Sequence, residues 1–462
     1  MNKYYMSKDG KTFRRLPKNA TGDFTVQDGV EVIAKGAFAG CDGLTSIMLP
    51  NSVKVINDEA FLGCANLKTM LLPEGLETIG EKAFFACTEL EEIILPSTLK
   101  SIGVMAFHSC CELKSIAIPQ GIDTIPGGCF DSCLSLSDVI LPDSVEVIGP
   151  HAFSQCRLKS FTFGPNIKVI GDSSFGQCKC ESIIIGASVS NIGLCAFFGN
   201  NLNKIEVDTG NRYFTDAKCN VIMEQTSGKI IQGTSNSTIP EGAKIIGLGA
   251  FNSQPAPKEL VIPSSVETIE SGAFIGCGES VIRLENGVKA IRECAFISFG
   301  REEKMTIYIP ASTEKIDAQF SSVDFRLDPN NPYYRYDAEG DNIISNEGAL
   351  IWGRLLQGIP TTGVTQVRFY PLGDFGYSKL IIPQNVKSTN DILSNSGIKK
   401  VLLEKGTMLD VSATWKTPCE IDYIIPKKKG PGNICKNTKY TIPAGESRAS
   451  IDDFLGKDSF FL

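Results

Sequence analysis

The chain has few of the residues and patterns from which reactive sites are built. It contains only two histidines, His108 and His151, among 462 residues, and its 16 cysteines never occur as C-x-x-C. Patterns typical of phosphate-binding loops (G-x-x-x-x-G-K-[ST]), serine hydrolases (G-x-S-x-G) and zinc proteases (H-E-x-x-H) do not occur. We therefore expect no catalytic residues, no cofactor and no metal ion, and we predict that the protein is not an enzyme.

The chain also lacks long apolar runs and clusters of basic residues, and both absences bear on its partners and location. No apolar run approaches the roughly 18 residues that a membrane helix needs, and the N-terminal residues MNKYYMSKDGKTFRRLP lack the apolar centre of a signal peptide. The formal net charge is −7, and the longest basic run is Lys427–Lys429. Nucleic-acid phosphates need stripes of Lys and Arg. We thus expect no nucleic-acid partner and no transmembrane segment, and a cytoplasmic location stays open.

A repeat of about 23 residues organises what the sequence does contain. Phenylalanine marks it, and most of these phenylalanines follow alanine. The spacing is 23 residues for the first six, then 22 for two more, and the series resumes after a gap. Its members are Phe38, Phe61, Phe84, Phe107, Phe130, Phe153, Phe175, Phe197, Phe251, Phe274, Phe296 and Phe320.

Other residue types keep the same spacing, and together they define the unit L-x-x-I-x-L-P-x-x-V-x-x-I-G-x-x-A-F-x-x-C-x-x. The alternating apolar residues of I-x-L predict a strand with one buried face, and the following Pro ends its ladder. The glycine is expected to permit a turn that larger residues resist. The A-F-x-x-C segment predicts one to two helical turns that point Phe and Cys inward. Because so short a unit cannot bury its own apolar side, stacked copies must share one core.

The same repeat explains half of the cysteines. Eight occupy one inward position, three residues after Phe: Cys41, Cys64, Cys87, Cys110, Cys133, Cys156, Cys178 and Cys277. A buried cysteine behaves as a small hydrophobe, and stacked thiols that point the same way are poorly placed to form disulfides. We interpret them as core residues. So many free thiols are typical of a reducing or anaerobic setting.

The combination of A-F-x-x-C with I-x-L-P at 23-residue spacing resembles the BspA-like leucine-rich-repeat family. The resemblance covers residues 26–325 well and the rest loosely. It implies a right-handed α/β repeat solenoid with a parallel β-sheet on one face and short helical turns on the other. It also implies a bacterial surface or secreted protein that binds macromolecules, with adhesion as the role. The family pattern carries no catalytic residues.

Turn-rich insertions interrupt the repeat. DTGNRYF begins one after Phe197, DPNNPYY begins another after Phe320, and the N-terminal NKYY segment is similar. We interpret all three as β-hairpins, with Lys8-Asp9-Gly10 as the first turn. The inner two are either tolerated insertions or elements that shape the binding face. The predicted parts are an N-terminal hairpin cap (1–25), regular repeats (26–207), a hairpin with a second repeat block (208–327), and a hairpin with degenerate repeats and a C-terminal cap (328–462).

The outward strand positions of the regular repeats are the candidate binding site. One column is mostly apolar, namely Met48, Leu71, Ile94, Ala117, Ile140, Thr162 and Ile184. Its polar neighbour begins at Ser46 and Thr69. An exposed apolar stripe is typical of an interaction surface, although β-branched residues also suit exposed strands. The leading hypothesis is adhesion or binding to a protein or glycan, for example one of the host matrix. The alternative is a structural spacer without a ligand of its own.

Overall fold

The computed structural model describes residues 5–253, 257–297, 305–317, 323–337, 342–353 and 364, and the backbone of six strands between residues 366 and 442. These parts contain 40 short β-strands. By compactness the chain divides into a first unit, Met1–Pro240 with Gly247–Pro257, and a second unit, Glu241–Ile246 with Lys258–Leu462. The four-part division expected from the sequence stays a prediction.

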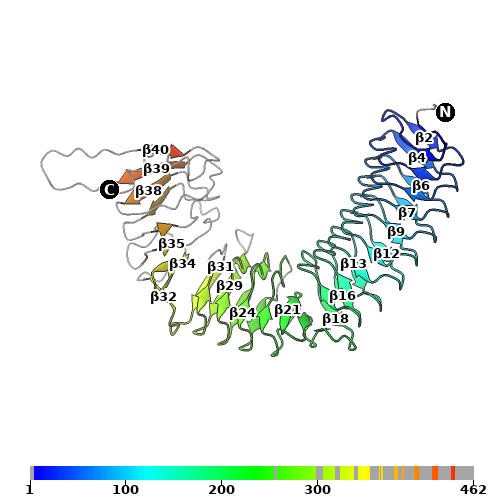
Figure 1. The fold of residues 1–462 in the computed structure, drawn as a ribbon. Helices are drawn as coiled ribbons and strands as arrows, with labels where there is room; N and C mark the ends of the chain where they lie inside the picture. The colour runs from blue at the N-terminus through cyan, green and yellow to red at the C-terminus, as the bar shows by residue number, and fades with distance from the viewer. Residues whose placement is uncertain are drawn as a thin grey trace. The chain divides into compact units, whose positions relative to one another are not determined.

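Each coil of the first unit contributes a strand to each of two parallel stacks (Figure 1). The stack that forms the sheet face contains β2 (Gly22–Thr25), β4 (Leu44–Met48), β6 (Thr69–Leu71), β8 (Glu92–Ile94), β10 (Ser115–Ala117), β12 (Asp138–Ile140), β14 (Ser160–Thr162), β16 (Ser182–Ile185) and β18 (Lys204–Val207). The return stack contains β1 (Thr12–Phe13), β3 (Val32–Ile33), β5 (Val55–Ile56), β7 (Thr78–Ile79), β9 (Ser101–Ile102), β11 (Thr124–Ile125), β13 (Val147–Ile148), β15 (Val169–Ile170) and β17 (Asn191–Ile192). The predicted leucine-rich-repeat solenoid with parallel sheets is therefore confirmed.

A continuous ladder of phenylalanine rings fills the core of the first unit. Phe38 and Phe61 stack with their ring centroids 5.0 Å apart, and Phe84 and Phe107 stack at 5.2 Å with an interplanar angle of 2°. Aromatic pairs at such separations add to the stabilisation from area burial. Phe13, from the N-terminal hairpin, stacks on Phe38 at 4.8 Å. The hairpin thus supplies the first ring of the ladder.

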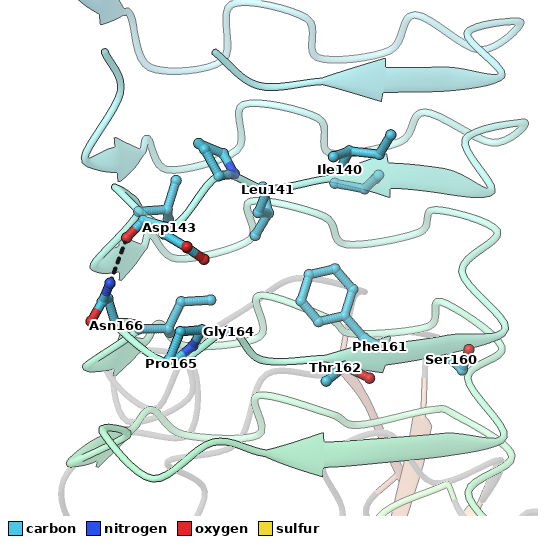
Figure 2. A pocket seen from close by; sticks show the side chains of 13 residues that line it. Ile140, Leu141, Asp143, Ser160, Phe161, Thr162, Gly164, Pro165 and Asn166 are labelled. Atoms are coloured by element: carbon cyan, nitrogen blue, oxygen red, sulfur yellow. Dashed lines mark hydrogen bonds between the residues drawn. The ribbon is translucent and has the colours of Figure 1, made fainter. Parts of the chain in front are cut away.

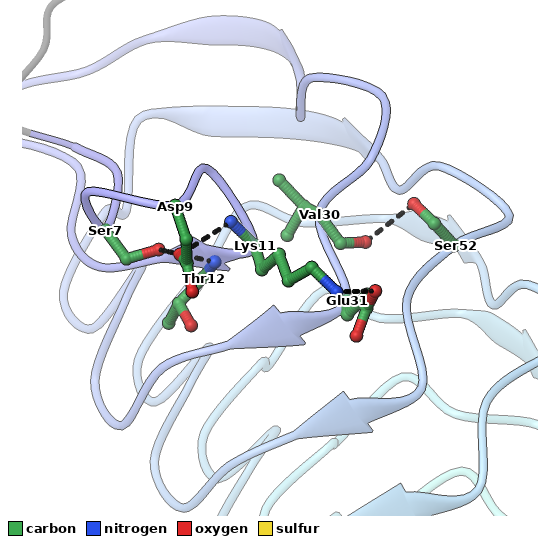
Figure 3. Close-up of polar contacts among 7 residues, drawn as sticks. All are labelled: Ser7, Asp9, Lys11, Thr12, Val30, Glu31 and Ser52. Atoms are coloured by element: carbon green, nitrogen blue, oxygen red, sulfur yellow. Dashed lines mark hydrogen bonds and ion pairs between the residues drawn. The ribbon is translucent and has the colours of Figure 1, made fainter.

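Polar contacts fix that N-terminal hairpin to the coils beside it (Figure 3). The Asp9 carboxylate accepts hydrogen bonds from the Ser7 hydroxyl and the Lys11 backbone N–H, which closes the turn. The Lys11 ammonium lies 2.9 Å from the Glu31 carboxylate. In the next coil, Ser52 Oγ donates to the Val30 carbonyl at 2.7 Å. The turn that was predicted around Asp9 is therefore present.

The corner around each phenylalanine is a series of turns, and the described residues form no helix. The expected short helical turns are thus not confirmed. Backbone N–H groups alternate in their acceptors: Phe38 N donates to the Ala60 carbonyl of the next coil, whereas Cys41 N donates three residues back to Phe38. The alternation requires a positive φ two residues before and after each Phe, as at Gly36 (62°) and Gly40 (72°). Helical backbone has no such residues.

The glycines of the I-G step have a different role from the one we expected. Gly80 and Gly103 are absent from the residues with positive φ, so they do not serve left-handed turns. A Cβ on Gly103 would lie 2.3 Å from the backbone nitrogen of Glu81 in the preceding coil, and one on Gly80 would lie 2.5 Å from the nitrogen of Asp58. The prediction of a turn glycine was wrong, because the constraint is close packing between coils.

The cysteine ladder is buried as predicted, and it also forms hydrogen bonds. Cys64 Sγ donates to the Phe38 carbonyl at 3.2 Å, and each later ladder thiol up to Cys178 reaches the Phe carbonyl of the preceding coil. In the Phe197 coil Asn200 occupies the equivalent position, and its amide donates to the Phe175 carbonyl at 2.8 Å. In these coils the position thus holds a small buried donor that also fills the core.

A buried asparagine anchors the insertion of the first unit. The Asn211 amide donates to the carbonyls of Gly186 (2.8 Å) and Val189 (3.0 Å), and its oxygen accepts the N–H groups of Tyr213 and Phe214, both at 2.8 Å. The chain then forms an antiparallel meander, because β20 pairs with both of its neighbours. Its strands are β19 (Phe214–Thr215), β20 (Ile222–Glu224) and β21 (Lys229–Gln232).

The second unit repeats the two-stack plan. Its face strands are β23 (Glu259–Ile262), β26 (Val281–Leu284), β29 (Met305–Ile309) and β31 (Val323–Leu327), and its return strands are β22 (Ile245–Ile246), β24 (Thr268–Ile269), β27 (Ala290–Ile291) and β30 (Lys315–Ile316). Two corners here pair as the short strands β25 (Phe274–Ile275) and β28 (Phe296–Ile297). The stack of Phe274 on Phe296, at 5.2 Å, continues the aromatic core within this unit.

The second insertion and the strands after it complete the described structure. Asn331 bonds to the carbonyls of Pro310 and Thr313 and to the N–H groups of Tyr333 and Tyr334, in the same pattern as the first insertion. The later strands are β32 (Tyr334–Tyr336), β33 (Asn342–Ser345), β34 (Ala349–Gly353), β35 (Gln366–Val367), β36 (Lys379–Ile382), β37 (Ser388–Thr389), β38 (Lys400–Glu404), β39 (Cys419–Ile424) and β40 (Lys439–Ile442). The predicted C-terminal cap, residues 451–462, lies outside the described residues.

The left-handed corner positions predict opposite effects for two matched substitutions. Gly63 has φ of 70°, and an added Cβ would lie no closer than 4.0 Å to another atom, so Gly63→Ala tests backbone strain alone. We expect it to destabilise the fold by about 1 kcal/mol. Ala86 holds the equivalent position with φ of 57°, and Ala86→Gly should stabilise by a similar amount. Urea denaturation measures both effects, and equal signs would contradict the turn geometry.

The thiol ladder predicts a loss of stability in alkali. Burial raises the pKa of Cys64 to about 12 and raises the pKa of Cys87 well above its ordinary value. Unfolded thiols ionise near pH 8.5, so stability should be unaffected below that pH and fall above it. Each ladder thiol should contribute about 1.4 kcal/mol per pH unit. Between pH 9 and 11, Cys87→Ala should show a shallower decline than the wild type in denaturation curves, and an identical slope would refute this role.

Candidate functional site

The predicted apolar column lies on the sheet face of the first unit, and its large side chains are exposed. Parallel pairing sets Met48 beside Leu71, Leu71 beside Ile94, Ala117 beside Ile140, and Thr162 beside Ile184. The exposed fractions of the five large members are 57% for Met48, 76% for Leu71, 60% for Ile94, 60% for Ile140 and 38% for Ile184. The register therefore aligns the predicted binding residues in three groups, which are Met48 with Leu71 and Ile94, Ala117 with Ile140, and Thr162 with Ile184.

The strand period of two explains why the row is exposed. In β6 the central residue Met70 is 3% exposed and packs into the core, so its neighbours Thr69 and Leu71 point outward. The register aligns Thr69 with Glu92 in the next coil, which builds the parallel polar column. The sheet face thus carries an apolar row beside a polar row.

An ion pair between successive coils borders these rows beside β8 and β10, where Lys114 Nζ lies 2.6 Å from the Glu91 carboxylate. The pair of Lys168 with Glu146, at 2.7 Å, lies beside the return strands β13 and β15. The hydrogen bond from Lys114 and its positive charge hold the pKa of Glu91 below its ordinary value. Because these charges are paired and exposed, they contribute little to stability. The paired charges already have partners, so the apolar row is the main surface of this face that is left to contact another molecule.

The ladder of the sheet face has two breaks. β8 and β10 belong to different sheets, and so do β12 and β14, whereas β10 pairs with β12 and β14 pairs with β16. The preceding corner is one residue shorter than its neighbour, since Cys156-Arg157-Leu158 replaces Cys133-Leu134-Ser135-Leu136. The shortened corner thus coincides with the second of the two breaks.

A cleft of about 390 Å³ opens at this interruption (Figure 2). Figure 2 shows Leu141 and Phe161 directed toward each other across the gap between the coils. Val139 is only half-buried here, although the equivalent Ile116 and Met70 of earlier coils are buried. Asn166 Nδ2 donates to the Asp143 carbonyl at 2.9 Å and closes one end. The sequence analysis did not predict this cleft. The feature of the sequence that could have indicated it is the shortened spacing between Cys156 and Leu158.

The remaining reactive residue types do not assemble into a second site. His108 Nδ1 lies 3.5 Å from an Asp131 carboxylate oxygen, and its ring lies 4.6 Å from the Phe85 ring. His151 lies in a different coil with φ of 55°. Within the described ranges, no cluster of three or more His, Cys, Asp or Glu side chains has a geometry that could hold a metal ion. Those ranges also contain no helix suited to crossing a membrane.

Comparison with known families gives one clear match. The family described as the BspA-type leucine-rich repeat region, with six copies, matches residues 13–135, 123–224 and 231–323. These segments include more than half of the chain. No curated protein matches the chain.

Comparison with solved structures gives the same fold. A leucine-rich cell surface protein from Faecalibacterium prausnitzii A2-165 is 24% identical, with 71% of this chain and 93% of that chain covered and a TM-score of 0.51. A leucine-rich repeat protein from Bacteroides ovatus ATCC 8483 is 26% identical, with 66% of this chain and 84% of that chain covered and a TM-score of 0.47. The first of these similarities supports the solenoid fold.

The interrupted ladder predicts that the same substitution lowers the free energy of unfolding by different amounts at two equivalent positions. Ile116→Asp places a carboxylate at a core position that is 3% exposed, so it should destabilise the protein by about 3 kcal/mol or more. Val139→Asp is at the cleft, where water reaches the side chain, and it should cost about 1 kcal/mol. Chemical denaturation of both variants measures the difference. Equal losses would show that the cleft is closed in solution.

Proposed function

Because this chain belongs to the BspA-type leucine-rich-repeat family, we propose that it is a non-catalytic adhesion or binding module. Its binding site is the apolar column of the first unit. The supporting observation is the series of large exposed side chains from Met48 to Ile184, which occupy equivalent positions of the face strands. Contiguous exposed apolar surface is typical of interaction sites. The repeated ordering of the coils keeps that surface rigid before a partner arrives, which lowers the entropy cost of binding.

The chemistry of the column favours a protein partner over a glycan. Its members are aliphatic apart from Thr162, and no aromatic or amide side chain lies among them. Aliphatic side chains gain affinity by packing against other apolar side chains and excluding water. The cleft between β12 and β14 lies beside Ile140 and is lined by Leu141 and Phe161, so it suits a single bulky apolar side chain of the partner as an anchor.

The same proposal includes a location. The similar protein from Faecalibacterium prausnitzii is described as a cell surface protein, and we extend a surface or secreted location to this chain. There the module would face protein partners such as those of a host matrix.

A structural spacer is the second candidate. It gains support from the β-branched members of the column, because Ile94, Ile140 and Ile184 suit a strand even when they contact only water. Met48 and Leu71 are not β-branched, yet their side chains are also exposed, and Leu71 is the most exposed member. Strand propensity alone therefore does not account for the column, which favours the binding function.

The test is a triple substitution with a matched control. Leu71→Lys, Ile94→Lys and Ile140→Lys in one chain should reduce binding to a panel of immobilised extracellular-matrix proteins by more than about tenfold. The exposed side chains leave the core intact, so thermal unfolding should be unchanged. The control places lysines at Val104, Leu134 and Leu194, which are similarly exposed but lie outside the face strands. Equal binding by the two variants, or no binding by the wild type, would contradict the proposal.

A further inference from the structure

A second cleft lies within the second unit, where β26, β29 and β31 end. Its volume is about 740 Å³, which falls within the range of roughly 300–1,000 Å³ that is typical of small-ligand sites. The buried side chains of Leu284, Ile309 and Leu327 form its apolar lining. Polar side chains surround this lining, so the cleft differs in character from the aliphatic column of the first unit.

Tyr308 gives the cleft an aromatic wall that is held in place. The Arg283 guanidinium lies over the Tyr308 ring, 4.1 Å from its centroid, and Arg283 Nε is itself 2.8 Å from the Glu259 carboxylate. Such a cation–π contact orients the ring. Tyr308 remains 37% exposed, and on its other side the register places Arg326, which pairs with Asp324 at 2.8 Å. The planar groups are therefore arranged before a ligand binds.

Amide and carboxylate groups converge on the same cleft. Asn286 and Asn330 line it with exposed side chains. Glu285 Oε2 accepts the Ser264 N–H at 3.0 Å, and Asp328 Oδ1 accepts the Asn330 N–H at 2.8 Å. Each carboxylate is thus anchored through one oxygen, and the other oxygen can accept a hydrogen bond from a ligand.

The second insertion builds one wall of this cleft. Asp328, Pro329 and Asn330 line it, and the buried amide of Asn331 fixes the next residue by bonds to Pro310 and Thr313. The first unit contains the same asparagine anchor at Asn211. There, however, the residue before the anchor is Gly210, which has no side chain. The anchor alone therefore does not explain the polar side chains.

The strands beside the two insertions also differ at equivalent positions. Ile184 in the first unit corresponds to Tyr308 in the second, and Glu206 corresponds to Arg326. The first unit thus offers neither the aromatic ring nor the guanidinium at this corner. It provides an internal control, with the same backbone anchor and different ligand-facing chemistry.

We propose that the cleft of the second unit binds a neutral oligosaccharide. A sugar ring presents an apolar C–H face, which packs on Tyr308, and vicinal hydroxyls that donate and accept hydrogen bonds. Asn286 and Asn330 supply both donors and acceptors, while Glu285 and Asp328 accept from hydroxyl groups. The two carboxylates exceed the charge of Arg326, which disfavours anionic sugars. Each carboxylate already accepts one backbone bond, which favours uncharged hydroxyls over a fully desolvated lysine or arginine.

The test is calorimetric titration of the full chain with four soluble neutral hexasaccharides. These are the α1,4- and β1,4-linked glucose oligomers, a mannose oligomer and an N-acetylglucosamine oligomer. At least one should bind, and Tyr308→Ala should weaken that binding by about tenfold. Asn330→Gly, which reproduces the first-unit residue, should weaken it about threefold or more through the lost hydrogen bonds. Val104→Ala, at an exposed apolar position of the first unit outside the face strands, is the control and should leave sugar binding unchanged.

Three outcomes would overturn the proposal. They are no binding by any of the four sugars, sugar binding that Tyr308→Ala leaves unchanged, and Tyr308-dependent binding of an oligolysine peptide without sugar binding. Thermal unfolding of each variant separates a local effect from misfolding, and the exposed positions of Tyr308 and Asn330 predict unchanged stability. The cleft and the apolar column lie on different units, so failure of one proposal leaves the other intact.

Discussion

The backbone hydrogen bonds between successive coils at the phenylalanine corner are the constraint on which the rest of the first unit depends. The N–H of Phe38 reaches the Ala60 carbonyl of the next coil, and the same bond recurs at Phe61 and Phe84. With coils fixed at this spacing, the rings stack about 5 Å apart. The Phe38 carbonyl then accepts one bond from the Cys41 N–H of its own coil and a second from the Cys64 thiol of the next coil, and this pattern recurs up to Phe153.

That tight spacing makes single residues consequential. A side chain at Gly103 would overlap the backbone of the coil before it, so the position is limited by packing rather than by backbone conformation. The one-residue shortening between Cys156 and Leu158 coincides with a break in the face ladder and with the half-buried Val139. A cleft thus lies where the repeat departs from its regular length.

The two units use one backbone plan to present different chemistry. The first unit carries an aliphatic row, which supports binding to a protein, and the second carries Tyr308 with amides and carboxylates, which supports binding to a sugar. Outward strand positions are free to vary because inward ones alone form the core. The two insertions likewise combine a common anchor with variable neighbours. Asn211 and Asn331 each anchor an insertion by the same pattern of hydrogen bonds, while the residues beside them differ.

The sequence by itself determined the repeat, the buried Phe and Cys positions, and the outward column from Met48 to Ile184, because strand period and repeat length fix which side chains share a row. Tertiary structure decided what depends on contacts between coils. It replaced the expected helical turns by turns with positive φ, gave Gly103 its packing role, and opened both clefts. These features arise from distances between coils, which residue spacing within one coil does not encode.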